Sequence, residues 1–202
     1  MGVFNGFPPF VWGNHDVIGD DISLLRKFAS EHALELKINV FPFMGIWNLP
    51  AQNVVDVAAA GISLTPERLT SDSYWSRPYR KVRRSALILK EASHTGYEDF
   101  KKFSVVGESV AHSHALKHLS RTATLHFASS IGEGVESLLR GETDAVGTGS
   151  VSAKHQALGD DRLKVIDLQK EEDDPELISF SLRREKSLLY SINDFIASSG
   201  LE

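Results

Sequence analysis

Hydrophobic and polar positions in the first part of the chain follow two different periods. Residues 20–33 repeat apolar side chains at helical spacing behind two aspartates, and because aspartate is a favoured N-cap, a helix is predicted there. Residues 34–40 alternate apolar and polar side chains, which is typical of a strand. Residues 54–60 are apolar and partly β-branched and end at Gly61, as in a parallel strand that is buried on both faces.

The succession of strands and helices continues to the end of the chain. Thr65 and Pro66 predict a helix start, with threonine as the cap and proline at the first helical position. Further strands are predicted at residues 85–90, 104–106, 122–127, 144–146, 163–168 and 177–182, and further helices at residues 111–119, 131–140, 150–157 and 188–197. The acidic run at residues 171–176 is predicted to be a solvated loop. This alternation implies an α/β fold with mainly parallel sheets, built in two batches.

Composition narrows the class of protein without identifying it. The chain has 202 residues, of which 42% are hydrophobic and 24% charged, the profile of a soluble globular protein with one domain or two small lobes. No apolar run approaches the roughly 18 residues that a membrane span needs. The net charge of -5 argues against nucleic acid as a partner, and the basic cluster at residues 77–84 is better explained as solvated surface. The lack of cysteine excludes disulfides and cysteine-based metal sites.

Several stretches, taken in order, carry a more specific pattern. They are Gly6–Phe10, Gly19–Ile22, Asp56–Arg68, Tyr74–Tyr79 and Gly141–Val146. Together they resemble the motifs of the bacterial extracellular solute-binding proteins of family 3, the periplasmic polar amino-acid-binding proteins of ABC transporters. The resemblance covers nearly the whole chain. It is most specific from Gly61 to Arg68, with Tyr79 at the expected distance, whereas Asp20 stands where an aromatic residue is usual.

The resemblance implies a fold and a task. The expected fold is the type II fold of periplasmic binding proteins, with two α/β lobes joined by a two-stranded hinge. Lobe 1 is expected to hold residues 1–84 and 182–202, and lobe 2 residues 85–181, with hinge strands near 85–90 and 177–182. The protein is expected to capture a small carboxylate-bearing ligand, an amino acid or a derivative, between the lobes.

The same resemblance implies a location and a partner. We expect a periplasmic or otherwise extracytoplasmic protein that delivers its ligand to the membrane permease of an ABC importer, without a cofactor. Residues 1–4 lack the charged and apolar segments of a signal peptide, so an exported protein would have had its signal peptide removed.

Three residues of the first lobe are expected to hold the ligand carboxylate. Arg68 matches the family's carboxylate-binding arginine, and a planar guanidinium can bind a carboxylate through two parallel hydrogen bonds. The alternative is a surface arginine on the first turn of a helix, where a cation is electrostatically unfavourable. Backbone groups of Gly61 and Ser63, with the Ser63 hydroxyl, are expected to complete the site.

Aromatic residues are expected to wall the ligand. Phe7 and Phe43 match family positions with this role, and aromatic stacking gives affinity without a charge. The alternative is that both are core residues. Trp12 and Trp47 are looser candidates, and Tyr79 is better explained by packing.

The second lobe departs from the family pattern. Ser109 is the best candidate contact, through its hydroxyl and amide at a helix N-terminus, and Thr148 is a second. Gly149 stands where amino-acid binders place an aspartate for the α-ammonium group. Because an unpaired buried ammonium is costly, an ordinary α-amino acid fits only if Glu108 or another acid substitutes.

Three histidines raise the question of a metal. His114 and His118 lie four residues apart and share a helix face with His112 nearby, and three histidines can bind zinc. No acidic residue in helical register completes such a motif. We expect a solvated helix surface and no metal.

Other functions stay open beside solute capture for import. One is the ligand-sensing domain of a receptor, and another is a degenerate lobe pair with a structural or signalling role. A third is an enzyme resembling cyclohexadienyl dehydratases, which expel water and carbon dioxide from a cyclic acid and need a general acid. Glu108 and Glu142 are the candidate acids, but no paired catalytic motif accompanies them, so we expect no catalysis.

Overall fold

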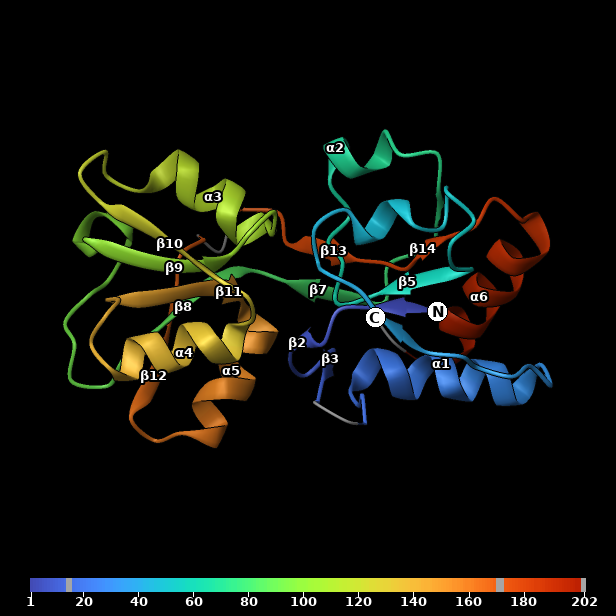
Figure 1. The fold of residues 1–202 in the computed structure, drawn as a ribbon, viewed down its shortest axis with the longest axis horizontal. Coiled ribbons are helices and arrows are strands. Elements are labelled where there is room, and N and C mark those ends of the chain that lie inside the picture. Colours follow the sequence, from blue (N-terminus) through green and yellow to red (C-terminus); the bar gives the residue numbers. More distant parts are fainter. Residues whose placement is uncertain (14–15, 170–172, 201–202) are drawn as a thin grey trace. The chain divides into compact units, whose positions relative to one another are not determined.

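The computed structural model describes residues 1–13, 16–169 and 173–200. Its chain divides into two units, each with its own sheet and helices (Figure 1). Unit 1 consists of Met1–Lys81 and Glu176–Glu202, and unit 2 consists of Val82–Pro175. The predicted α/β fold with two lobes is confirmed.

The apolar run before Gly61 forms β5 (Val57–Ala59), the central strand of the unit 1 sheet, whose order is β4-β1-β5-β14-β6. Its other strands are β1 (Gly2–Val3), β4 (Asn39–Val40), β6 (Tyr74–Trp75) and β14 (Ser181–Leu182). β1 runs parallel to β4 and β5, whereas β14 runs antiparallel to β5 and β6. All residues of β5 are buried, as expected of a strand covered on both faces.

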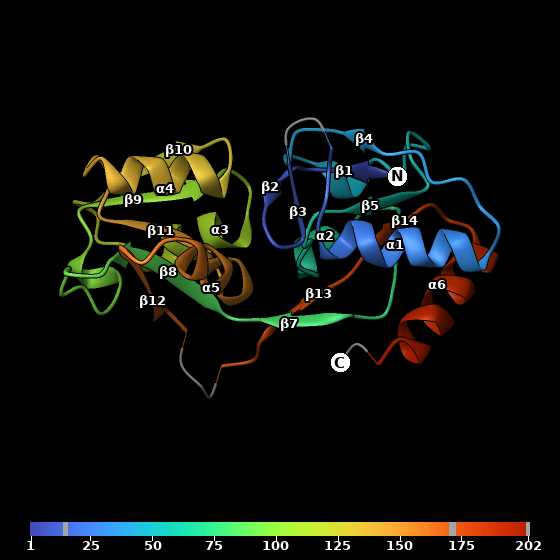
Figure 2. The same ribbon diagram turned by 90° about the horizontal axis from the view of Figure 1, so that it is seen from below.

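Two longer helices, α1 (Asp20–Glu31) and α6 (Lys186–Ser198), lie side by side in unit 1 (Figure 2). The rings of Phe28 and Phe195 meet between them with centroids 5.5 Å apart. The unit also contains the hairpin of β2 (Gly6–Phe7) and β3 (Val11–Trp12), the 3-10 helix η1 (Ile46–Asn48) and the short helix α2 (Pro66–Leu69). The apolar positions of α1 are buried in unit 1, and Phe28 on this face contacts α6.

Unit 2 is built on a five-stranded sheet in the order β10-β9-β11-β8-β12. The strands are β8 (Arg84–Leu89), β9 (Lys102–Val106), β10 (Thr124–Ala128), β11 (Ala145–Gly149) and β12 (Leu163–Asp167). The helices are η2 (Tyr97–Asp99), α3 (Val110–His118), α4 (Ile131–Leu139) and α5 (Ser150–Gly159). Gly147 belongs to the tightest part of this core, because a Cβ there would lie 2.4 Å from the ring of Phe103.

Two short strands, β7 (Arg80–Val82) and β13 (Glu176–Ile178), pair with each other where the chain passes from one unit to the other. We expected these passages near residues 84 and 182, but residues 176–181 belong to unit 1. The reason lies in backbone pairing, since Leu64 N donates to Leu177 O at 2.7 Å and Ser63 forms an antiparallel bridge with Ile178.

Three other expectations need correction or refinement. The alternating segment 34–40 is a strand only at β4, and Leu34 and Val40 are 55% and 51% exposed, because the segment lies at the edge of its sheet. The sheets are not purely parallel, because β14 in unit 1 and β8 in unit 2 run antiparallel to both of their neighbours, while the other strands of each sheet share one direction. Of the acidic run, residues 171–172 lie outside the described residues, while Glu176 is part of β13.

No helix in the described ranges is long and apolar enough to cross a bilayer.

Candidate functional site

The helix start at Thr65 positions Arg68. Thr65 is the N-cap of α2, Pro66 is its first residue, and the Thr65 hydroxyl accepts a hydrogen bond from the amide of Arg68 at 3.4 Å. The predicted cap is thus confirmed. The side chain of Arg68 does not extend over the surface, because the residue is only 5% exposed. A buried guanidinium is costly unless it is bound, so its contacts define the environment of the candidate site.

The guanidinium of Arg68 is held from two sides. Nη1 donates to the carbonyl oxygen of Ser63 at 2.9 Å. The carbon Cζ lies 4.1 Å from the ring centroid of Trp47 and 5.6 Å from that of Phe43. Such cation–π contacts stabilise the charge and fix the plane of the group. A guanidinium held in a fixed plane is suited to bind a planar carboxylate.

Aromatic residues form a continuous cluster next to Arg68. The Phe43 ring lies 5.9 Å from that of Trp47 and 4.7 Å from that of Phe7, and Phe7 lies 5.1 Å from Phe4. Phe7 and Phe43 are 9% and 5% exposed, so both are also part of the unit 1 core. Phe43 contacts the charge directly, whereas Phe7 packs edge-to-face against Phe43. Their contact with a ligand stays a prediction.

Gly61 begins the loop that leads to Ser63, and its backbone is fixed by a buried carboxyl group. The amide of Gly61 donates to Asp21 Oδ2 at 2.9 Å, and the Tyr79 hydroxyl donates to Asp21 Oδ1 at 2.7 Å. Gly61 has φ +59°, and a Cβ there would lie 2.6 Å from the ring of Phe10. Both the conformation and the close ring require glycine.

Burial changes the ionisation of the Asp21 carboxyl group that fixes the Gly61 backbone. Desolvation raises the pKa of Asp21 to about 7, although the hydrogen bonds from Tyr79 and Gly61 act in the opposite direction. Burial and the neighbouring Asp21 raise the pKa of Tyr79 as well. Tyr79 also stacks on Phe180, with ring centroids 4.4 Å apart, which agrees with the packing role expected for it. Asp21 thus supports the loop. The N-cap role expected for the two aspartates is wrong, because the N-cap of α1 is Gly19 and both aspartates lie in the first turn.

Ser63 contacts a second charged residue. Its hydroxyl donates to Glu176 Oε2 at 2.8 Å, and its side chain is buried with the residue 6% exposed. Glu176 is half-buried in β13. Among the predicted residues of unit 1, the structure therefore brings Gly61, Ser63, Arg68 and Phe43 together, and adds Glu176 to them. Glu176 was not predicted as a site residue, because it is the last residue of the acidic run at 171–176 that was predicted to be a solvated loop.

Ser109 and Thr148 are both in unit 2. Ser109 is the N-cap of α3, and its hydroxyl accepts a hydrogen bond from the amide of His112 at 3.2 Å. Thr148 is in β11, is 4% exposed and pairs with Ser85. Each residue thus has a structural role, and ligand contact by either stays a prediction.

The glycine that replaces the family's aspartate lies beside a cation. Gly149 is the N-cap of α5, and a Cβ there would lie 3.1 Å from Nη2 of Arg84. Arg84 is 5% exposed, so the expectation that the whole basic cluster is solvated surface is wrong for this residue. Residue 149 itself therefore supplies no acid, and the atom nearest to its Cβ position belongs to a guanidinium group.

The side chains of His114 and His118 contact other rings of unit 2. His114 Nδ1 and the Tyr97 hydroxyl are hydrogen-bonded at 2.9 Å, and the ring of His118 lies 4.3 Å from that of His114. Burial, with the neighbouring His118 and Arg84 side chains, lowers the pKa of His114 to about 4. His114 is half-buried, which corrects the expected solvated surface. Among the described side chains, no group of three His, Cys, Asp or Glu residues could hold a metal ion.

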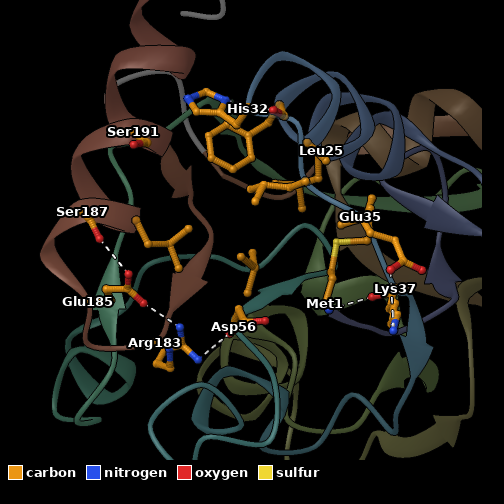
Figure 3. Close-up of a pocket in the computed structure, with 16 residues that line it drawn as sticks. Met1, Leu25, His32, Glu35, Lys37, Asp56, Arg183, Glu185, Ser187 and Ser191 are labelled. Atoms are coloured by element: carbon orange, nitrogen blue, oxygen red, sulfur yellow. Dashed lines mark hydrogen bonds and ion pairs between the residues drawn. The ribbon is translucent and has the colours of Figure 1, made fainter.

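A cavity of about 410 Å³ lies elsewhere in unit 1, between α1, the segment 34–37 and α6 (Figure 3). Its polar groups are bound to one another. Arg183 pairs with Asp56 at 2.8 Å and with Glu185 at 2.6 Å, and the amino group of Met1 donates to Lys37 O at 2.8 Å. The described lining includes none of the predicted site residues, so we do not assign the ligand to this cavity.

Comparisons with known proteins give a consistent result. The family model of the bacterial extracellular solute-binding proteins, family 3, matches residues 1–199. No curated protein matches the chain significantly. Several solved structures have the same fold.

One such structure is a truncated, arginine-bound form of ArgBP from T. maritima, with a TM-score of 0.86 and 23% identity over 98% of this chain and 94% of that one. Another is the substrate-binding protein of an amino acid ABC transporter, with a TM-score of 0.87 and 21% identity over 98% and 91% of the two chains. A third is an ancestral amino acid-binding protein, a precursor of cyclohexadienyl dehydratase, with a TM-score of 0.87 and 22% identity over 98% and 87%. At these identities the likeness shows a shared fold.

Proposed function

The chain belongs to the bacterial extracellular solute-binding proteins of family 3, and on this premise we propose that it captures a small carboxylate-bearing solute, an amino acid or a derivative, for an ABC importer. The proposal places the protein outside the cytoplasm and gives it a membrane permease as its partner. Structural neighbours described as amino acid-binding proteins support the solute class. A receptor's sensing domain would use the same capture step with a different partner.

The buried guanidinium of Arg68 is the observation that carries the proposal. Trp47 fixes its plane, and the carbonyl of Ser63 accepts from one of its nitrogens. These contacts hold the guanidinium in a fixed plane, and a planar guanidinium can bind a carboxylate through two parallel hydrogen bonds. We assign the solute carboxylate to Arg68 and to the Gly61–Ser63 loop, with Phe43 and Phe7 as the aromatic wall. Ser109 and Thr148 are the proposed contacts from unit 2.

Capture without catalysis is the simplest form of the proposal. One structural neighbour is a precursor of cyclohexadienyl dehydratase, so a cyclic acid of that enzyme's class belongs among the test compounds. Consumption of such an acid by the purified protein would replace the proposal by the enzyme alternative.

A thermal-shift screen with the twenty L-amino acids, opines and small carboxylates tests capture. A ligand at a hundred times its Kd adds about 2.7 kcal/mol to the free energy of unfolding, which gives a clear shift in Tm. The substitution Arg68→Ala is expected to abolish the shift while the protein stays folded. Arg26→Ala, which removes an exposed arginine from α1, is the matched control and should retain the ligand-induced shift in Tm. A screen without any shift, or unchanged affinity in Arg68→Ala, would refute the proposal.

A further inference from the structure

Ser63 lies between two opposite charges of unit 1. Its carbonyl oxygen accepts from Arg68 Nη1 at 2.9 Å, and its hydroxyl donates to Glu176 Oε2 at 2.8 Å. The position of Glu176 is fixed by main-chain pairing, because Leu64 N donates to Leu177 O at 2.7 Å and Ser63 is bridged to Ile178. A carboxylate of β13 therefore contacts the same residue whose carbonyl oxygen binds the guanidinium.

Unit 2 does not provide an acid at the position where the family pattern has one. Gly149 is there, and Nη2 of Arg84 lies 3.1 Å from where its Cβ would be. Residue 149 therefore provides no carboxylate, and the neighbouring group is a guanidinium nitrogen. If the solute carries an ammonium group, its partner must be another carboxylate.

We propose that Glu176 binds the cationic group of the solute, so that the Ser63 loop recognises a zwitterion through Arg68 on one side and Glu176 on the other. This inference rests on the proposed capture of a carboxylate at Arg68. An α-amino acid carries its two charges on adjacent carbon atoms, so its two binding groups must lie close together. Contacts of Arg68 and Glu176 with the same residue meet that condition. The solute is accordingly an α-amino acid with a free amine, rather than a plain carboxylate.

The test compares pairs of solutes that differ only in the α-amine. Isothermal titration calorimetry is carried out with four L-amino acids, leucine, phenylalanine, glutamine and arginine, and with the same four acids without the amine. The variants are Glu176→Gln, which removes the charge and keeps an oxygen that can accept from the Ser63 hydroxyl, and Asp174→Asn. Asp174 is exposed and two residues away, so its substitution controls for a general change of charge. Thermal unfolding of each variant without solute confirms that it is folded.

Wild-type protein is expected to bind at least one amino acid about tenfold or more tightly than its amine-free counterpart, the effect of a charge-assisted hydrogen bond. Glu176→Gln is expected to lose this preference and to retain weak binding of the carboxylate, while Asp174→Asn keeps the preference. An undiminished preference in Glu176→Gln, or equal binding of both members of every pair by wild-type protein, would overturn the role of Glu176 and leave capture intact. Absence of binding for all eight compounds, together with no shift in the thermal screen, would overturn both.

Discussion

The substitution Asp21→Asn is expected to change how the stability of the protein depends on pH. Asp21 is fully buried, and its carboxyl group accepts hydrogen bonds from Gly61 N and the Tyr79 hydroxyl. Asparagine keeps the shape and stays neutral. Its oxygen can accept from Gly61 N, and its amide can donate to the oxygen of Tyr79, which also accepts.

The expected magnitude follows from the pKa. Burial raises the pKa of Asp21 from 3.8 to about 7, so the folded protein keeps a proton that the unfolded chain loses. The stabilising contribution of this residue is therefore complete below pH 4 and is lost as the pH rises through about 7. At about 1.4 kcal/mol for each pKa unit, the loss amounts to about 4 kcal/mol. The Asp21→Asn variant, whose side chain stays neutral, should not lose this stability as the pH rises.

Urea denaturation of wild-type and variant protein between pH 4 and pH 8 measures the effect. The difference in the free energy of unfolding, wild type minus Asp21→Asn, is expected to fall by about 4 kcal/mol across this range. Tyr79→Phe removes a hydrogen bond that favours the charged carboxylate, so the pKa of Asp21 should rise further in this variant. The loss of stability of the variant should then extend to higher pH than in wild-type protein. A difference that is constant within about 1 kcal/mol, or that rises with pH, would refute the argument that Asp21 is neutral in the folded protein.

Three further substitutions test the site and its supports. Gly61→Ala places a Cβ 2.6 Å from a buried ring and should cost about 1–3 kcal/mol in urea denaturation, whereas Gly159→Ala meets nothing within 4 Å and should not destabilise. Trp47→Leu removes the ring over the Arg68 guanidinium and should weaken amino acid binding in calorimetry by roughly tenfold; unchanged affinity would exclude a role of the ring in holding the guanidinium. Ser109→Ala should cost about 1 kcal/mol by loss of the α3 cap, and Ser109→Asp should restore stability; if Asp restores stability but not affinity, the hydroxyl also serves the ligand.

Local sequence patterns predicted the parts of the site whose structure is determined locally. The helix start at Thr65, with the arginine three residues later, is a short-range signal, and it places Arg68 as expected. The glycine requirement at Gly61 has a partly local cause, its positive φ. The succession of strands and helices along the chain also follows from periodicity, which is why the fold class was predicted.

Contacts between distant residues could not be read from the same patterns. Ser63 and Glu176 are 113 positions apart, and only the pairing of β13 with the Ser63 loop brings them together. Arg84 and His114 looked like solvated residues because their neighbours in sequence are polar, yet unit 2 buries the first and half-buries the second. The sequence shows the type and spacing of side chains, whereas burial depends on the partners that the fold supplies.

The central claim is that Arg68 binds the carboxylate of a captured solute, and wild-type protein alone can test it. The measurement is a calorimetric titration with the L-amino acid that shifts Tm most in the screen, followed by the amino alcohol derived from it. The alcohol keeps the amine and the side chain and lacks only the carboxylate. Loss of a buried charge pair predicts that the alcohol binds about a hundredfold more weakly or not at all. Equal affinity for the two compounds would contradict the account.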